Sequence, residues 1–417
     1  MSDYFEQITV SSAADGTEGL APRIGLCLSG GGFRAALFGL GVVRYLAETG
    51  RLADVVAVSA VSGGSIAAAV IADHWPELER DAFSARAFDS QVTEPFIAEI
   101  TRRNLRNRGL ARWALTRGVP QGRRRGAALG VTMTKHLLQT KRVADLPQGL
   151  QVILTSTDLV SGRAFRVSRD FIGGWEFGYA ATPPTLTVAT AIAASTAMPF
   201  LFPPVHLRTA GLGLRPTVPP ELALVDGGVY DNLGLEWFQG WDRGRPSAAR
   251  PVDFIITVDA AGPLRPKAKR YGWAASLRRS QEAQYAQTRA SRVRWFVDQL
   301  LTGRLEGIHV PIHGDPVAFQ PPPGASAAAG AADGALPAGF AEAISAVRTD
   351  LDRFLRDECE LLMYHGYWSA HVRLRHIRPA LAVQRPAWRA YADLAAPEEQ
   401  RLRAVLAAGQ RRSLRRR

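Results

Sequence analysis

The sequence contains little cysteine and no long apolar run. Its only two cysteines, Cys27 and Cys359, cannot form a disulfide framework or a zinc cluster by themselves. No run of about 18 apolar residues occurs, so we expect no segment that spans a membrane. The first ten residues, MSDYFEQITV, include Asp3 and Glu6 and lack the apolar centre of a secretory signal. We therefore expect a cytoplasmic protein, either soluble or peripheral on the inner face of the membrane.

Acidic residues are missing from two segments of the chain. Residues 101–144 contain no Asp or Glu and carry +12, and residues 401–417 also lack acids and carry +7. The formal net charge of the chain is +13, so the remainder carries −6. Such basic segments attract anionic lipid surfaces or nucleic acid phosphates. Leu105 and Trp113 interleave with the first segment, which favours an anionic membrane, and nucleic acid is not an expected partner. The alternative is a solvated surface helix and a solvated tail.

The composition is that of a folded protein. Hydrophobic residues make up 47% of the 417 positions and aromatic residues 8%, which excludes a wholly disordered chain. This length allows two or three domains of roughly 150 residues each, or one large α/β domain with additions.

A strand, a tight turn and a helix are predicted twice near the start of the chain. An apolar run at 24–28 ends in three glycines and precedes a helix expected at 35–48. A second apolar run at 55–61 ends in Ser-Gly-Gly-Ser and precedes a helix that begins near Ile66. This order is typical of a parallel α/β sheet.

Other elements follow later in the chain. Apolar runs predict strands at 150–155, 222–225 and 254–258. The low-complexity stretch 321–339 predicts a loop, and a helix is expected from Phe340 to about Tyr364.

The first glycine turn, Gly30-Gly31-Gly32, leaves backbone N–H groups free to contact an anion. With Ala35 it satisfies the dinucleotide fingerprint G-x-G-x-x-[G/A]. That fingerprint expects an acid at the end of the second strand, whereas Asp54 lies before the strand. No Gly-Lys-Ser/Thr follows, which excludes a P-loop. An oxyanion hole for a tetrahedral intermediate and a simple packing turn remain the other interpretations.

The second turn is typical of a nucleophile elbow. Its sequence Ala60-x-Ser62-x-Gly64 matches G-x-S-x-G with alanine at the first position. Ser59 is expected within the strand and Ser65 within the helix, so Ser62 is the candidate nucleophile. The structural alternative is an N-cap serine.

Asp226 is the candidate base for this serine. It ends the run 222–226 and precedes two glycines, and the carboxyl ends of parallel strands meet at one edge of a sheet. Asp259 and Asp158 are alternative carboxylates. His309 and His313 follow Asp226 in the Ser…Asp…His order of α/β-hydrolases, so a triad stays open.

The ordered set of motifs resembles the patatin-like phospholipase family. That family combines a G-G-G-x-[R/K] loop, a G-x-S-x-G elbow and a D-G-[G/A] acid. These match residues 30–34, 60–64 and 226–228, and residues 191–204 resemble the stretch that precedes the acid. Alanine at position 60 is the main departure.

The resemblance implies a three-layer α/β/α domain with a central, mostly parallel sheet and a catalytic Ser–Asp dyad. Ser62 would attack an ester carbonyl, Asp226 would accept its proton, and Arg34 would fix the glycine loop. The expected oxyanion hole consists of Gly30, Gly31, Gly32 and Gly63. No cofactor or metal is expected.

The resemblance also divides the chain. We expect an N-terminal extension at 1–21 and a patatin-like domain at 22–375 with a basic insertion at 101–144 and a loop at 321–339. An Arg-rich tail follows at 376–417. The implied function is hydrolysis of fatty acyl esters in phospholipids or lysophospholipids. The alternatives are a Ser-His-Asp esterase or acyltransferase, and a non-enzymatic nucleotide-binding α/β protein.

Overall fold

A computed structural model describes most of the chain. The described residues are 21–115, 132, 135–199, 201–239, 246, 248–264, 271–322, 325 and 328–411. The expected N-terminal extension, much of the first basic segment and the last six residues therefore lie outside the described part. The domain boundaries remain predictions.

Ten strands in the described part form one mixed sheet. Its order is β10-β9-β1-β2-β3-β4-β5-β6, with β8 paired to β3 and β7 paired to β8. The strands are β1 Ile24–Leu28, β2 Val55–Val61, β3 Gln151–Asp158, β4 Ala164–Val167, β5 Phe171–Gly174, β6 Gly178–Ala181, β7 Val205–Arg208, β8 Glu221–Asp226, β9 Phe254–Asp259 and β10 Gly307–Pro311. The five strands from β10 to β3 are parallel, whereas the others pair antiparallel.

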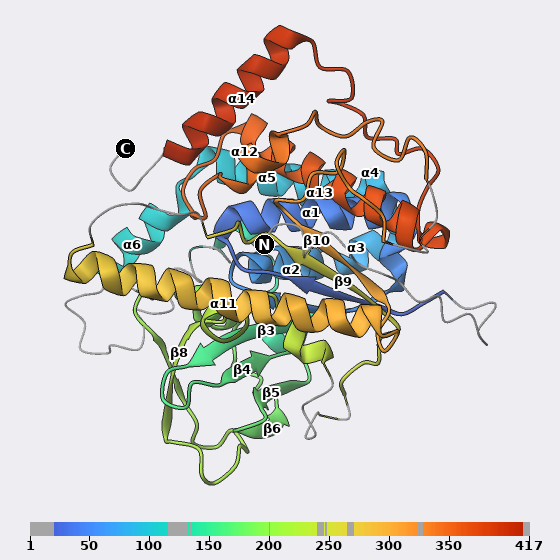
Figure 1. Cartoon of the computed structure of the whole chain (residues 1–417). Coiled ribbons are helices and arrows are strands. Elements are labelled where there is room, and N and C mark those ends of the chain that lie inside the picture. Colours follow the sequence, from blue (N-terminus) through green and yellow to red (C-terminus); the bar gives the residue numbers. More distant parts are fainter. Residues whose placement is uncertain are drawn as a thin grey trace.

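Helices cover both faces of the sheet (Figure 1). They are α1 Gly32–Glu48, α2 Gly63–Asp73, α3 Trp75–Arg80, α4 Ala85–Phe88, α5 Glu94–Arg102, α6 Leu105–Leu115, α9 Val188–Thr196, α10 Gly228–Asp231, α11 Trp273–Leu301, α12 Phe340–Ser345, α13 Arg356–Ile377 and α14 Ala396–Arg411. Short 3-10 turns occur at Leu52–Asp54, Val143–Asp145, Leu235–Phe238 and Pro379–Leu381, and a π-helical turn at Asp89–Thr93. No helix in these described ranges is both long and apolar enough to cross a membrane.

The alternation of side chains along the parallel strands builds two cores. Leu26 and Leu28 of β1 belong to the core that includes α1, α2 and α13. Cys27, between them, belongs to the core that includes Phe296 of α11. Successive strand residues point to opposite faces. The expected three-layer α/β fold is therefore confirmed.

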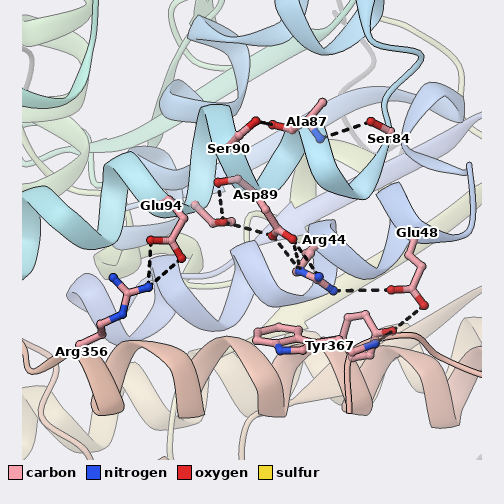
Figure 2. Close-up of polar contacts among 11 residues, drawn as sticks. Arg44, Glu48, Ser84, Ala87, Asp89, Ser90, Glu94, Arg356 and Tyr367 are labelled. Atoms are coloured by element: carbon pink, nitrogen blue, oxygen red, sulfur yellow. Dashed lines mark hydrogen bonds and ion pairs between the residues drawn. The ribbon is translucent and has the colours of Figure 1, made fainter. Parts of the chain in front are cut away.

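Helices α1 and α13 pack against each other and share polar contacts (Figure 2). The Arg44 guanidinium of α1 lies 2.8 Å from an Asp89 carboxylate oxygen, and Tyr367 of α13 donates to Glu48 at 2.7 Å. These contacts, with the aromatic core beneath them, fix the helix that begins at the glycine turn.

The prediction of one continuous helix from Phe340 to about Tyr364 is wrong. The helix is broken between α12 and α13, because the chain there supplies carbonyl groups to other elements. The carbonyls of Ser345 and Val347 accept from Arg34, and that of Asp350 accepts from Phe33. These backbone carbonyl groups are hydrogen-bonded to other parts of the chain, and no helix is formed in the described stretch between Ser345 and Arg356.

The direction of the strand at 221–226 also differs from expectation. β8 runs antiparallel to β3, with Asp226 opposite Ser156. β2 pairs with the preceding part of β3, with Val61 opposite Thr155. β2 and β8 thus occupy successive parts of β3 and run toward each other. Asp226 therefore meets the residue that follows Val61 head-on, and not at a shared parallel edge.

Candidate active site

Ser62 lies in a strained turn between β2 and α2. Its backbone has φ 52° and ψ −118°, a region that non-glycine residues seldom adopt. A Cβ on Gly63 would lie 2.0 Å from the carbonyl oxygen of Gly32, and one on Gly64 would lie 2.2 Å from that of Leu28. Only glycine therefore fits at both positions, and the turn has the geometry of a nucleophile elbow.

The Ser62 hydroxyl donates to Asp226. The distance from Oγ to Oδ2 is 2.6 Å, and the backbone N–H of Gly228 donates to Oδ1 at 2.8 Å. Asp226 is buried, with only 5% of the residue exposed. Burial raises the pKa of Asp226 to about 6, although the hydrogen bonds from Ser62 and Gly228 act in the opposite direction. A base with a pKa near the working pH suits proton transfer.

Ser195 of α9 holds the elbow from the other side. Its Oγ accepts from the backbone N–H of Ser62 at 3.0 Å and donates to the carbonyl of Thr155 at 2.6 Å. The Ser65 hydroxyl lies 2.8 Å from the same oxygen. Because the hydrogen of Ser195 is used toward Thr155, Ser65 is the donor in this pair. The sequence places Ser195 in the family-like stretch 191–204 but does not reveal this contact.

The glycine loop lies beside the elbow. The N–H of Gly30 already donates to the carbonyl of Asn232 at 2.9 Å, so it is not a free donor. Gly32 and Gly63 begin α1 and α2, where N–H groups have no partner within the helix. Gly31, the residue before α1, has φ 139°. Of the four glycines expected to form the oxyanion hole, Gly30 is therefore excluded, and Gly31, Gly32 and Gly63 remain the candidate donors.

Arg34 ties this loop to distant parts of the chain. Its buried guanidinium donates to the carbonyls of Ser345 at 2.6 Å, Val347 at 2.8 Å and Ala260 at 2.7 Å. These contacts match the loop-fixing role that the resemblance implies.

The alternative acid Asp259 has other partners. The Arg289 guanidinium lies 2.6 Å from its Oδ2, and His309 Nε2 lies 3.1 Å from the same oxygen. Although burial acts in the opposite direction, Arg289 and His309 lower the pKa of Asp259. His309 belongs to β10, three strands from β2, which is about 14 Å at the usual strand spacing. His309 therefore cannot complete a triad with Ser62 in this arrangement.

Asp158 and His313 are the remaining alternatives to the proposed site residues. Asp158 accepts from the backbone N–H groups of Ser161 and Ala223, at 2.9 and 3.0 Å, so it caps the turn after β3. His313 lies two residues after the end of β10, three strands from β2, and is exposed.

Tyr285 of α11 is a site residue that the sequence did not indicate. Its ring lies 3.1 Å from the place where a Cβ on Gly228 would stand. Burial raises the pKa of Tyr285, and the charge of Asp226 adds to this effect. No local motif marks this position, because the contact joins two distant segments.

The family model described as patatin-like phospholipase matches residues 26–237. No curated protein matches the sequence significantly. Human GIVD cytosolic phospholipase A2 is similar in structure, with 13% identity, a TM-score of 0.48 and coverage of 86% of this chain and 60% of that chain. The same protein in complex with methyl gamma-linolenyl fluorophosphonate is 14% identical, with a TM-score of 0.49 and coverage of 88% of this chain and 60% of that chain. VipD from Legionella pneumophila is 15% identical, with a TM-score of 0.30 and coverage of 73% of this chain and 64% of that chain. This chain thus spans less than two thirds of each of these proteins.

Proposed function

This chain belongs to the patatin-like phospholipase family, and we propose that it is a serine hydrolase that cleaves fatty acyl esters of phospholipids or lysophospholipids. The observation that carries the proposal is the 2.6 Å contact between Ser62 Oγ and Asp226 Oδ2. Both residues lie within the stretch that the family model matches. The proposal needs no cofactor.

The proposed reaction has two halves. Ser62 Oγ attacks the ester carbonyl carbon while Asp226 accepts the hydroxyl proton, which forms a tetrahedral intermediate with a negatively charged oxygen. The amides of Gly31, Gly32 and Gly63 would donate to that oxygen. Asp226 then gives the proton to the departing alcohol, and the acyl group stays on Ser62. In the second half a water molecule attacks the acyl-serine while Asp226 accepts its proton. Asp226 then returns this proton to Ser62 Oγ as the fatty acid leaves.

Electrostatics compensates for the weak base. A carboxylate with a pKa of about 6 cannot remove the proton of an alcohol in advance, so proton transfer must accompany the attack. The positive N-terminal end of α2 lies at Ser62 and favours the developing anion. One oxyanion donor contributes about 3 kcal/mol to such a transition state.

A hydrolase assay with phosphatidylcholine and lysophosphatidylcholine tests this proposal. Ser62→Ala should abolish fatty acid release, and Asp226→Asn should lower kcat by about 10²–10⁴. His309→Gln, a change in a neighbouring buried cluster, should be mild. A Ser62→Ala protein that releases fatty acid as fast as wild type would refute the nucleophile. A loss of activity in His309→Gln as large as that in Asp226→Asn would contradict a dyad that works without histidine.

The nucleotide-binding alternative is less well supported. The Gly30 amide is engaged with Asn232. The backbone of the second turn also packs directly on Gly32, which fits a loop that serves Ser62 better than one that cradles a pyrophosphate. Calorimetry with dinucleotides should give no binding heat.

The proposed binding of an anionic membrane through residues 101–144 and 401–417 is harder to support. Several arginines in the described part of these segments already have partners. Arg106 contacts Asp350, and Arg403 lies 2.8 Å from Glu399. These two arginines stabilise the packing of their own segments, which leaves them less able to contact lipid.

A further inference from the structure

Exposed large apolar side chains gather around the candidate active site. The carboxyl ends of the parallel strands β10, β9, β1, β2 and β3 form one edge of the sheet, called here the catalytic edge because Ser62 follows β2. Leu159 and Val160 directly follow β3, and Val160 is 60% exposed. Leu264 lies in the segment that follows β9 and is also exposed. Exposed apolar residues thus lie on both sides of Ser62 along this edge.

Two further exposed side chains, Met198 and Trp175, belong to segments that flank β8 and β3. Met198 follows Ala197, whose carbonyl accepts the backbone N–H of Asp226. Trp175, which is 51% exposed, lies in the turn after β5. β5 runs in the same direction as β3, because each pairs antiparallel with β4. Trp175 therefore reaches the catalytic edge, where it lines an open surface pocket together with Tyr230 of α10.

Helix α11 adds a third part of this surface by extending past the sheet. From its C-terminal part toward its N-terminus, the helix contacts the core first and then the catalytic edge. Phe296 packs in the core, Arg289 pairs with Asp259 at the end of β9, and Tyr285 lies close to Gly228. Twelve residues before Tyr285, at 1.5 Å per residue, Trp273 lies about 18 Å farther along the axis. Helix α11 is the long yellow-to-orange helix labelled in Figure 1. Trp273 is 81% exposed, and Leu277, one turn later, is 47% exposed.

We propose that these side chains form an interfacial face that docks on an anionic phospholipid bilayer, with Trp273 and Leu277 entering the headgroup region. The face consists of Leu159, Val160, Trp175, Met198, Leu264, Trp273 and Leu277. Exposed apolar residues are normally scattered, and their concentration marks an interaction surface. Tryptophan is enriched at the boundary between lipid and water. The inference rests on the proposed function, because a lipid hydrolase has to receive its ester from a membrane.

Charge favours a bilayer as the occupant. Arg163 follows the loop of Val160, and Arg278 follows Leu277. Both are exposed, and Arg278 also lies 3.3 Å from Glu282, a contact in which the arginine stays open to solvent. From Leu264 to Glu282 the sequence contains six basic residues and one acidic residue, although those at 265–270 lie outside the described part. Each basic residue near an anionic surface adds to the attraction. A protein partner seated on the same face would cover the approach to Ser62, whereas a bilayer supplies the substrate.

Vesicle binding by a protein that cannot turn over tests the inference. Ser62→Ala protein is mixed with phosphatidylcholine vesicles with and without phosphatidylglycerol, and the bound fraction is measured by flotation. Added Trp273→Ala and Leu277→Ala changes should weaken binding by about tenfold or more, because two apolar side chains no longer enter the interface. The matched control is Leu301→Ala, since Leu301 is 37% exposed at the opposite end of the same helix.

Each outcome decides the inference. Loss of binding in the Trp273/Leu277 variant, with Leu301→Ala unchanged, supports it. Equal binding by all variants overturns it, and so does an equal loss in the Leu301→Ala control. The same two changes in a chain that keeps Ser62 should leave hydrolysis of a soluble short-chain ester unchanged, and a loss there would also overturn it. Failure of the wild-type chain to hydrolyse any ester would refute the proposed function, while the binding comparison would still decide the docking face.

Discussion

Ser62 and Asp226 meet because the strands that carry them run head to head along the same side of β3. Val61 of β2 pairs with Thr155, and Asp226 of β8 pairs with the next residue, Ser156. The hydroxyl and the carboxylate are therefore positioned by sheet hydrogen bonds on both sides. Only the turn residue Ser62 lies between the end of β2 and the contact, so the geometry is set mainly by the centre of the sheet.

The pH dependence of the reaction should report Asp226. Burial raises the pKa of this carboxyl to about 6, and only its ionised form accepts a proton. With a soluble short-chain ester, kcat/KM should rise with pH with unit slope, bend near pH 6 and stay level above it. The measurement is initial rate against pH. A profile without a bend between pH 5 and 7 would contradict the assignment of Asp226 as the base.

The same carboxyl should reduce stability at neutral pH. The pKa of Asp226 is about 6 in the folded protein and 3.8 as the ordinary value, so the folded state binds more protons between these values. Stability from this group is therefore highest below about pH 4 and falls as pH rises to about 6. Asp226→Asn should raise the free energy of unfolding by up to about 3 kcal/mol at pH 8, and by much less at pH 4. Denaturant unfolding at the two pH values checks this, and an equal gain at both would be inconsistent with it.

Ser195 should act as a positioning residue. Its Oγ accepts from the Ser62 N–H and the Ser65 hydroxyl and donates to the Thr155 carbonyl, so Ser195→Ala leaves all three groups without this partner. At about 1 kcal/mol per hydrogen bond, we expect a fall in kcat of about tenfold with little change in KM. Ser59→Ala is the control, because the buried Ser59 hydroxyl has no hydrogen-bond partner in the described part of the chain. If both variants lose kcat equally, Ser195 has no special role.

Ala60 and Gly63, on either side of Ser62, should respond differently to a change of one methyl group. Gly63→Ala places a Cβ against the carbonyl of Gly32 and should lower kcat by 10²-fold or more, the loss expected when an oxyanion donor is displaced. Ala60→Gly, which restores the usual motif, should keep the activity and cost about 1 kcal/mol of stability, because glycine weakens a strand. Ester hydrolysis and thermal unfolding measure both effects. A fully active Gly63→Ala protein would show that the two turns are not as closely packed as described.

Local patterns in the sequence were enough to predict the two strand–turn–helix units and the turn that carries Ser62. The glycines and the flanking apolar runs that define these units lie within a few residues of each other. The direction of β8 could not be predicted, because antiparallel pairing with β3 depends on contacts about 70 residues apart along the chain. The break between α12 and α13 likewise depends on Arg34, which is 311 residues from Ser345.

Site residues that lack a motif were also missed. Tyr285 approaches Gly228 only because α11 crosses the sheet, and the contact of Ser195 with Ser62 requires α9 to pack beside the elbow. Glycine at position 30 was expected to be an oxyanion donor from its motif alone. Its engagement with Asn232 could be found only from the folded chain.

Mass spectrometry after reaction with a fluorophosphonate ester tests the central claim most directly. The account predicts one adduct per chain, located on Ser62, absent from Ser62→Ala and formed at least about 10²-fold more slowly in Asp226→Asn. An adduct on another residue, or an Asp226→Asn protein that is labelled as fast as wild type, would contradict the proposed pair of nucleophile and base.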